Sequence, residues 1–176
     1  MREPGPGDHL VGILEGLGRG FAIGHDGVFA VRGLVDEGRQ VAFVSKRGDD
    51  KASQVYVIAV DGGEARRVTN LPTGADAPKW FPDSQRLAFV SAIWTDLVRW
   101  DDQEKRRKER DETKMSGKTW TRAPIAYWDH YLDDREAHVF SIALTGGEPA
   151  AITRLSGFQL SKQEYDGDSY DLSPDG

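Results

Sequence analysis

A serine nucleophile held on a sharp turn is the first chemistry to seek in this sequence. That turn requires the pattern Gly-x-Ser-x-Gly, because its strained backbone tolerates no side chains beside the serine. None of the serines in the 176 residues stands in this pattern. The nearest is Ser169, in the segment 167–171 (GDSYD), where an aspartate replaces the second glycine. We therefore predict no catalytic residue in this chain and no hydrolysis by the chain alone.

Histidine is the commonest general base, and the chain has four: His9, His25, His130 and His138. His138 stands at the start of an expected strand, where a related phrase has Gln54, so a structural role is the simpler interpretation. His130 lies in the distinctive motif YWDHY, residues 127–131. Without a qualifying serine, these histidines do not make a catalytic triad.

Two acidic clusters invite a metal interpretation. The first contains histidines as well, but its spacing fits no known zinc ligand pattern, and an aspartate-rich turn is the commoner origin of such a cluster. Its members are Asp129, His130, Asp133, Asp134 and His138. The second evokes a calcium loop, but the order of ligands fails at the third position. Its members are Asp166, Asp168, Asp171 and Asp175. We predict neither a metal nor a cofactor.

The remaining candidate motifs also have simpler interpretations. The run 16–20 (GLGRG) is rich in glycine, but no clear strand precedes it and no Gly-Lys-Ser/Thr follows, so it is not a phosphate loop. The run 104–112 (EKRRKERDE) mixes both signs of charge at helical spacing, which predicts a solvated helix or a mobile arm. Aromatic residues flank this run and offer it surface for docking against the propeller, the hydrolase or a substrate; they are Trp94, Trp100, Trp120, Tyr127 and Trp128.

Composition excludes several classes of protein. The net charge is −6, whereas nucleic-acid binding needs a basic face. There is no cysteine, so disulfides and thiol chemistry are excluded. The stretch 1–21 contains no long apolar run, so we expect neither a signal peptide nor a membrane-spanning helix. These features predict a cytoplasmic protein with no nucleic-acid or membrane partner.

Two internal repeats organise the chain. Val35–Ser45 (VDEGRQVAFVS) returns as Phe81–Ser91 (FPDSQRLAFVS), 46 residues later. Gln54–Asn70 returns as His138–Arg154, 84 residues later, with seven identities in 17 positions. A third copy of the first phrase begins at Ser173–Gly176 (SPDG), 92 residues after Phe81. A period of 40–50 residues is typical of solenoids and propellers.

Each repeat predicts strands of one antiparallel sheet. Val41–Ser45 and Leu87–Ser91 are short and apolar, as interior strands are. Gln54–Val60 and Glu64–Thr69 flank Asp-Gly-Gly, a strong hairpin signal. One unit therefore contains four antiparallel strands, the content of a propeller blade. Large side chains at equivalent positions should be buried between adjacent sheets; they are Phe43, Tyr56, Phe89 and Phe140.

We therefore predict an all-β fold, a partial β-propeller of four-stranded WD40-like or TolB-like blades. Residues 1–27 form an atypical glycine-rich segment, and 28–176 hold about two blades and the start of a third. Residues 92–137 are an insertion, because 46 residues separate Ser91 from His138 whereas eight separate Ser45 from Gln54.

Four segments carry a resemblance to a known family: Gln54–Pro72, Ala77–Asp83, Pro82–Ser91 and the YWDHY motif at 127–131. Together they resemble the N-terminal β-propeller of the prolyl oligopeptidase family of serine peptidases, in the acylaminoacyl peptidase and dipeptidyl aminopeptidase branch. The likeness runs from about Val28 to Gly176. It departs at 35–38 (VDEG), which replaces the expected SPDG turn.

This resemblance implies a non-catalytic role in proteolysis. In that family the propeller admits small peptides to a C-terminal α/β-hydrolase domain, which these 176 residues do not include. The expected partners are that domain and small peptides. Trp128, Asp129 and His130 would then lie at the substrate entrance or at the surface that docks the hydrolase.

Two alternatives to a peptidase part stay open. Similar phrases occur in TolB-like propellers that bind proteins without enzymatic activity, and a truncated reading frame would have no function of its own. Because an incomplete propeller exposes edges and apolar faces, we expect the isolated chain to be marginally stable and to self-associate.

Overall fold

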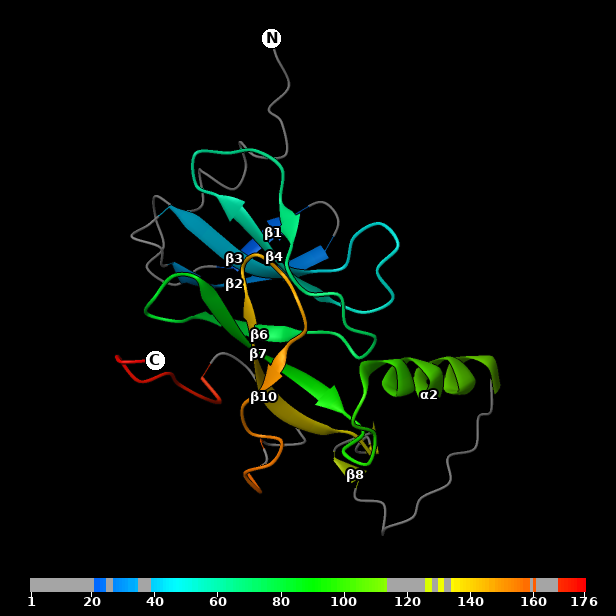
Figure 1. Ribbon diagram of the computed structural model, residues 1–176. Coiled ribbons are helices and arrows are strands. Elements are labelled where there is room, and N and C mark those ends of the chain that lie inside the picture. The colour runs from blue at the N-terminus through cyan, green and yellow to red at the C-terminus, as the bar shows by residue number, and fades with distance from the viewer. Residues whose placement is uncertain are drawn as a thin grey trace.

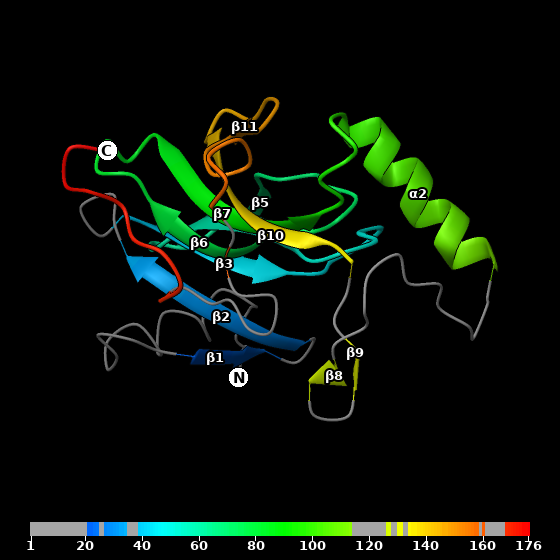
Figure 2. The same ribbon diagram turned by 90° about the horizontal axis from the view of Figure 1, so that it is seen from below.

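Most of the chain folds into two antiparallel sheets that lie one over the other (Figures 1 and 2). The computed structural model describes residues 21–24, 27–34, 39–113, 126–127, 130–131, 134–158, 160 and 168–176. Among these residues, no helix has the length and apolar character needed to cross a membrane.

The first sheet has five strands in sequence order. They are β1 (Phe21–Gly24), β2 (Gly27–Leu34), β3 (Gln40–Ser45), β4 (Gln54–Ala59) and β5 (Arg66–Arg67). β1 lies inside the segment that the sequence sets apart as atypical, and it pairs with β2 from Phe21↔Ala30 to Gly24↔Gly27.

The second sheet repeats the last four strands of the first. They are β6 (Asp76–Trp80), β7 (Arg86–Ile93), β10 (Glu136–Ala143) and β11 (Ala150–Ala151), in the spatial order β11-β10-β7-β6. The insertion between β7 and β10 holds a helix, α2 (Trp100–Thr113), and a small pair of strands, β8 (Ala126–Tyr127) and β9 (His130–Tyr131). The described structure is thus mostly β, with one helix, and its strands do not close into a ring of blades.

The predicted strands and hairpins are confirmed. β3 and β7 are interior strands, with a paired neighbour on each side. β4 pairs with β5 through Tyr56↔Arg67, and β10 pairs with β11 through Phe140↔Ala151. The hairpin turns need glycine, because Gly62 and Gly63 have φ of 104° and 111° and their counterparts Gly146 and Gly147 have 88° and 118°.

Equivalent backbone hydrogen bonds recur at the repeat spacing. The amide of Val60 donates to the carbonyl of Arg39 at 2.8 Å, and that of Leu144 donates to Gln85 at 2.8 Å. The turn at the start of β7 recurs in the third copy of the phrase. There the amide of Gly176 donates to Ser173 at 3.0 Å, as that of Ser84 donates to Phe81 at 3.0 Å.

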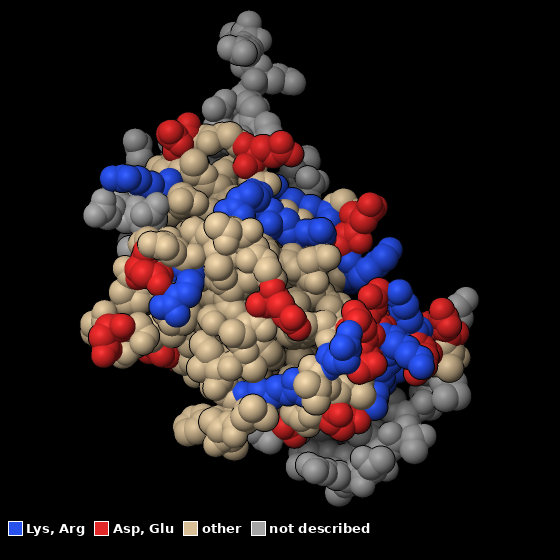
Figure 3. Space-filling model, viewed as in Figure 1, with Lys and Arg blue, Asp and Glu red and all other residues tan. Residues whose placement is uncertain are grey.

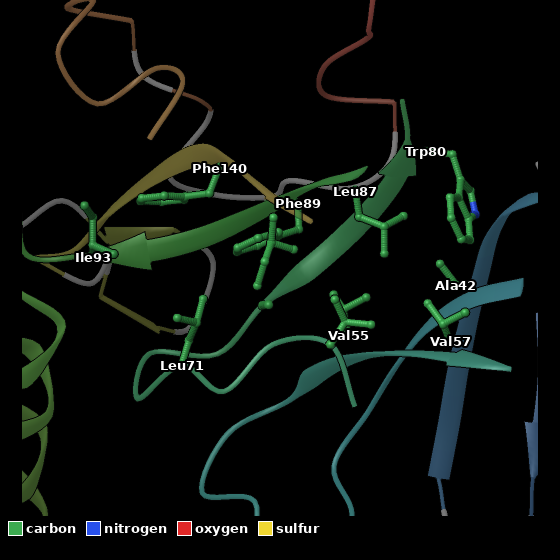
Figure 4. Packing of buried hydrophobic residues seen from close by; sticks show 12 residues of the cluster. Ala42, Val55, Val57, Leu71, Trp80, Leu87, Phe89, Ile93 and Phe140 are labelled. Atoms are coloured by element: carbon green, nitrogen blue, oxygen red, sulfur yellow. The ribbon is translucent and has the colours of Figure 1, made fainter. Parts of the chain in front are cut away.

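The core between the sheets joins small residues of the first sheet to large residues of the second (Figure 4). The first sheet contributes Ala42, Val55 and Val57. The second contributes Trp80, Leu87, Phe89, Ile93, Phe140 and Ile142. Aromatic rings carry the largest apolar area in such a core, and Phe89 and Phe140 stack across β7 and β10 with ring centroids 5.9 Å apart.

The expected burial of Phe43, Tyr56, Phe89 and Phe140 is confirmed, but only Phe89 and Phe140 lie between the two described sheets. Phe43 and Tyr56 are buried and stack at 5.9 Å, but they lie in a separate cluster on the other face of the first sheet. Side chains alternate between the two faces of a strand. Val41 and Phe43 therefore point away from the second sheet, whereas Ala42 between them points toward it. The two sheets therefore stack face to back, with the aromatic face of one on the small-residue face of the other.

Candidate docking site at the insertion

The residues singled out by sequence lie in the insertion beyond α2. Trp128 and Asp129 lie outside the described residues. His130 lies in β9, where it pairs with Tyr127 of β8. The part of the insertion whose side chains are described is its base, where the chain leaves β7, forms α2, and returns to β10.

Trp94 is the centre of this base. It follows the last residue of β7 and is buried. Three guanidinium groups lie over its ring, those of Arg106, Arg110 and Arg135, at 5.7, 4.9 and 5.6 Å from the ring centroid. Its indole Nε1 donates to Asp134 Oδ1 at 3.1 Å. The ring thus joins both ends of the insertion, since Arg106 and Arg110 belong to α2 and Asp134 precedes β10.

Carboxylates balance the charge of these arginines. Arg106 donates twice to Asp96, with both distances 2.8 Å, and Arg110 donates twice to Asp134. The hydrogen bond from Arg106 holds the pKa of Asp96 below its usual value. Paired charges over an aromatic ring make a docked base whose arginines are not free to hold an external anion.

A buried glutamine ties α2 to the end of β7. Gln103 is the buried residue of the helix. Its Oε1 accepts from the amide of Trp94 at 3.0 Å, and its Nε2 donates to the carbonyls of Trp94 and Leu97 at 2.7 and 2.9 Å. Trp100, at the start of the helix, packs its ring against Phe140 at 5.3 Å. The helix is therefore fixed to the sheet at its N-terminal end.

The second hairpin supplies another anchor. Arg154, three residues after β11, donates to the carbonyls of Thr95, Leu97 and Val98. These carbonyls belong to the connection between β7 and α2. A recess of about 80 Å³ lies beside this contact, lined in part by Trp100, Phe140 and Arg154. It is far smaller than the roughly 300 Å³ of a usual ligand pocket.

The charged run forms a helix that is mostly in solvent, as expected. Figure 3 shows acidic and basic side chains side by side over α2. Within one face, Lys108 pairs with Glu104 at 2.7 Å and Arg107 with Asp111 at 2.6 Å. Ion pairs of this kind on a solvated helix add little to stability. The exposed face of α2 thus carries side chains of both charge signs, and they nearly cancel.

His138 and Asp134 do not come together as metal ligands. Asp134 is held by Trp94 and Arg110, whereas His138 lies within β10 with its Nδ1 3.3 Å from Thr153 Oγ1. Burial lowers the pKa of His138, although Glu136, 3.8 Å from its Nε2, favours the charged form. Within the described part of the chain, no three acidic, histidine or cysteine side chains are grouped to hold a metal.

His138 is instead one version of a repeated polar clamp. In the first unit, Thr69 Oγ1 accepts from the amide of Val55 at 2.9 Å and donates to Gln54 Oε1 at 2.8 Å. In the second unit, Thr153 Oγ1 accepts from the amide of Val139 at 2.9 Å. His138 replaces Gln54 beside it. The structural role predicted for His138 therefore agrees with its position.

Sequence reasoning missed Gln103, Arg154 and Asp134 as anchors. Gln103 stands in a charged run, and a lone uncharged residue there is a weak signal of a buried helix face. Arg154 and Asp134 act across 57 and 40 residues of sequence, so their partners follow from the tertiary structure alone. Among the described residues, the site is thus an anchored helix, α2, with charged and aromatic side chains at its base, and it contains no activated nucleophile.

Comparisons with known proteins agree with the sequence resemblance. No family model matches the chain. The "Uncharacterized peptidase YuxL" of Bacillus subtilis is 35% identical over 98 residues, which cover 51% of this chain and 15% of that peptidase. The chain is therefore a distant homologue of a peptidase, and it matches only a small part of that protein's length.

Two solved structures are also similar to this chain. The AtxE2 isopeptidase in its apo form has a TM-score of 0.46 at 16% identity, with 72% of this chain and 18% of that one covered. The putative TolB from Agrobacterium tumefaciens has a TM-score of 0.33 at 17% identity, with 75% and 50% covered.

Proposed function

We propose that this chain is a non-catalytic propeller portion of a serine peptidase of the prolyl oligopeptidase family. In this role it limits access of peptides to a hydrolase domain that carries the catalytic residues. Short peptides pass, and long or folded chains are held out. The anchored insertion contributes to the entrance or to the surface that docks the hydrolase.

One observation supports the proposal most directly. The chain is 35% identical to a peptidase over 98 residues, yet its own sequence contains no Gly-x-Ser-x-Gly pattern. Homology to a peptidase without a nucleophile elbow is what a non-catalytic part of such an enzyme would have. The stacked sheets support the same role, because sheets that pack against one another can form a fixed wall beside an entrance to the hydrolase.

The anchoring of α2 supports a role for the insertion. Trp94, Gln103 and Arg154 hold its base to the second sheet, while its charged face stays in solvent. A helix held along one face, from Gln103 to Arg110, and exposed on the other face can contact a second domain. Trp128, Asp129 and His130 follow in the same insertion, and we place the entrance contact there.

A chimera tests this function. The segment of peptidase YuxL that matches is replaced by the matching segment of this chain, together with its insertion. Hydrolysis is followed with a peptide series that the parent peptidase cleaves and with an unfolded protein that it spares. We expect the chimera to keep both properties. A matched chimera with Phe89→Ser, which disrupts packing between the sheets, should begin to cleave the unfolded protein.

A folded chimera that cleaves long and short substrates alike would show that this chain does not control access. A folded chimera without any activity would show that it does not fit a peptidase. Either result favours the alternative of a TolB-like propeller that binds a protein and has no part in hydrolysis.

A further inference from the structure

The repeated polar clamp contains a residue that can take up a proton in the second unit but not in the first. In the first unit, Gln54 bonds to Thr69 and also to the backbone of Leu71. Its Oε1 accepts from the amide of Leu71 at 3.0 Å, and its Nε2 donates to the carbonyl at 2.8 Å. An amide side chain stays neutral, so this clamp does not respond to pH. His138, at the same place in the second unit, can become charged at mildly acidic pH.

The imidazole of His138 is buried without a full set of hydrogen bonds. The residue is 2% exposed, and its Nδ1 lies 3.3 Å from Thr153 Oγ1. Its Nε2 is buried and, within the described part of the chain, has no hydrogen-bond partner. Both ring nitrogens of a charged imidazole carry protons and need acceptors. The packing therefore suits the neutral ring, and protonation requires the surroundings of Nε2 to change.

Two charged side chains act on this ring in opposite directions. Glu136, two residues earlier on β10, has its Oε2 3.8 Å from Nε2 and favours the protonated ring. Arg154, directly after Thr153, opposes it, because two positive charges repel. A proton on His138 therefore draws the ring toward Glu136 and pushes the guanidinium of Arg154 away.

The other elements at this junction do not change that balance. On β7, Ser91 pairs with His138 in the ladder, and its hydroxyl lies 2.8 Å from that of Thr73 in the connection before β6. Neither hydroxyl titrates in this range of pH. On the connection between β7 and α2, the carboxylate of Asp96 is bound by Arg106.

Arg154 is also the side chain that joins the clamp to the insertion. Its guanidinium donates to the carbonyls of Leu97 and Val98 at 2.9 and 3.0 Å. The carbonyl of Leu97 also accepts from Gln103 Nε2 at 2.9 Å, so Arg154 and the buried residue of α2 hold the same peptide group. The first unit, whose clamp contains the neutral Gln54, has a connection of eight residues at this place and no insertion.

We propose that His138 and Arg154 form a pH-sensitive switch for the base of the insertion. When His138 takes up a proton, Arg154 releases the carbonyls of residues 95–98, and the connection into α2 loosens while both sheets stay folded. The proposal depends on this junction and not on the peptidase role, so it can hold for a binding propeller as well.

The direction of the switch follows from proton linkage. In the closed base, burial holds the pKa of His138 below the ordinary 6.5. In the loosened base, water reaches the ring and the pKa returns toward that value. The loosened form thus binds more protons below pH 6.5, and its population rises as the pH falls. A single proton can change the ratio of the two forms by at most about tenfold for each pH unit.

Amide hydrogen exchange across residues 94–103 tests the switch. It is measured in the 176-residue chain at about pH 7.5 and pH 5.5 and corrected for the pH dependence of the exchange chemistry. We expect loosening to make this segment exchange several-fold faster at the lower pH, with about tenfold as the upper limit over this range. At pH 5.5 the rate should exceed that of β3 and change little in dilute urea, because a local opening exposes little surface.

Histidine variants assign the effect to one ring. His138→Gln should remove the pH dependence of exchange across 94–103. Substitution of His9, His25 and His130 by glutamine leaves His138 as the single histidine and should keep it. In that chain, the nuclear magnetic resonance signals of the His138 ring and of amides 94–103 should shift with one midpoint, below pH 6.5.

Arginine variants test the connection to the insertion. Arg154→Gln should speed exchange across 94–103 at pH 7.5 and leave little further increase at pH 5.5. Arg99→Gln is the matched control, because Arg99 lies on the same connection with its side chain 74% exposed, and it should change neither rate.

Three results would overturn the proposal. The first is the same pH dependence in His138→Gln as in the natural chain, or a His138 titration that leaves amides 94–103 unchanged. The second is unchanged exchange in Arg154→Gln. The third is exchange across 94–103 with the same rate and urea dependence as β3, because His138 would then act only on unfolding of the whole chain.

Discussion

Phe43 and Phe89 lie 46 residues apart, occupy the same position in successive sheets, and face the same direction along the stack. Only Phe89 therefore lies between the two described sheets, whereas Phe43 faces away from the second sheet. If the two sheets packed with their equivalent faces toward each other, the rings of Phe43 and Phe89 would both lie between them. Face-to-back stacking lets each unit contact only its neighbours, as in repeat proteins.

The first prediction concerns the interface between the sheets. Phe89→Ala removes a fully buried ring that stacks on Phe140, and we expect it to lower the free energy of unfolding by about 3–5 kcal/mol. Leu155→Ala, at a side chain 94% exposed, should change it by less than about 0.5 kcal/mol. Urea unfolding measures both. Equal effects of the two substitutions would contradict the assigned packing.

The second prediction concerns the repeated clamp. Thr69→Val keeps the shape of the side chain but removes the acceptor for the amide of Val55 and the donor to Gln54. We expect a loss of about 1–3 kcal/mol, because buried polar groups are left without partners. Thr153→Val, the matched variant in the second unit, should cost less, because Thr153 is half-buried and its contact with His138 Nδ1 is long, at 3.3 Å. A larger loss for Thr153→Val than for Thr69→Val would contradict this account of the two clamps.

The third prediction is a pH dependence carried by His138. Burial holds its pKa below the ordinary 6.5, with Glu136 opposing and Arg154 assisting the shift. The unfolded chain therefore takes up a proton below pH 6.5 that the folded chain takes up only at lower pH, so stability falls as the pH drops through this window. His138→Gln introduces the residue of the first unit and removes this titration.

Urea unfolding between about pH 7 and pH 5 measures this effect. The stability of His138→Gln relative to the natural chain should rise as the pH falls. Carboxylates that titrate in both proteins cancel in this difference. Parallel stability curves for the two proteins would rule out a contribution from His138.

These features differ in how far the sequence could predict them. Strands β3 and β7 and both hairpins follow from local patterns, namely short apolar runs and Asp-Gly or Gly-Gly turns. The direction in which Phe43 faces does not, because β3 is apolar on both of its faces, as in a strand buried on both sides. Only the stacking order distinguishes those faces.

The base of the insertion shows the same limit. Its charged run predicts a helix because i,i+4 pairs are local, and α2 is that helix. The burial of Gln103 and the reach of Arg154 depend on where the helix lies against the sheet, which no local pattern specifies.

The fourth prediction concerns this base. Trp94→Ala removes the ring that Arg106 and Arg110 cover and that donates to Asp134. We expect faster amide exchange across 100–113, because the anchor that holds α2 is lost. Lys108→Ala, on the exposed face of the helix, should leave exchange unchanged apart from slight fraying. Unchanged exchange in Trp94→Ala would show that Gln103 and Arg154 suffice to hold the helix.

The most direct test of the face-to-back arrangement is a set of nuclear Overhauser contacts between the sheets. In the folded chain, the ring protons of Phe89 should give contacts to the methyl groups of Val55 or Val57, because these residues share one cluster. The ring protons of Phe43 should give contacts to Ile58 and none to Leu87. Contacts from the Phe43 ring to Leu87 or Phe89 would contradict this account of the fold.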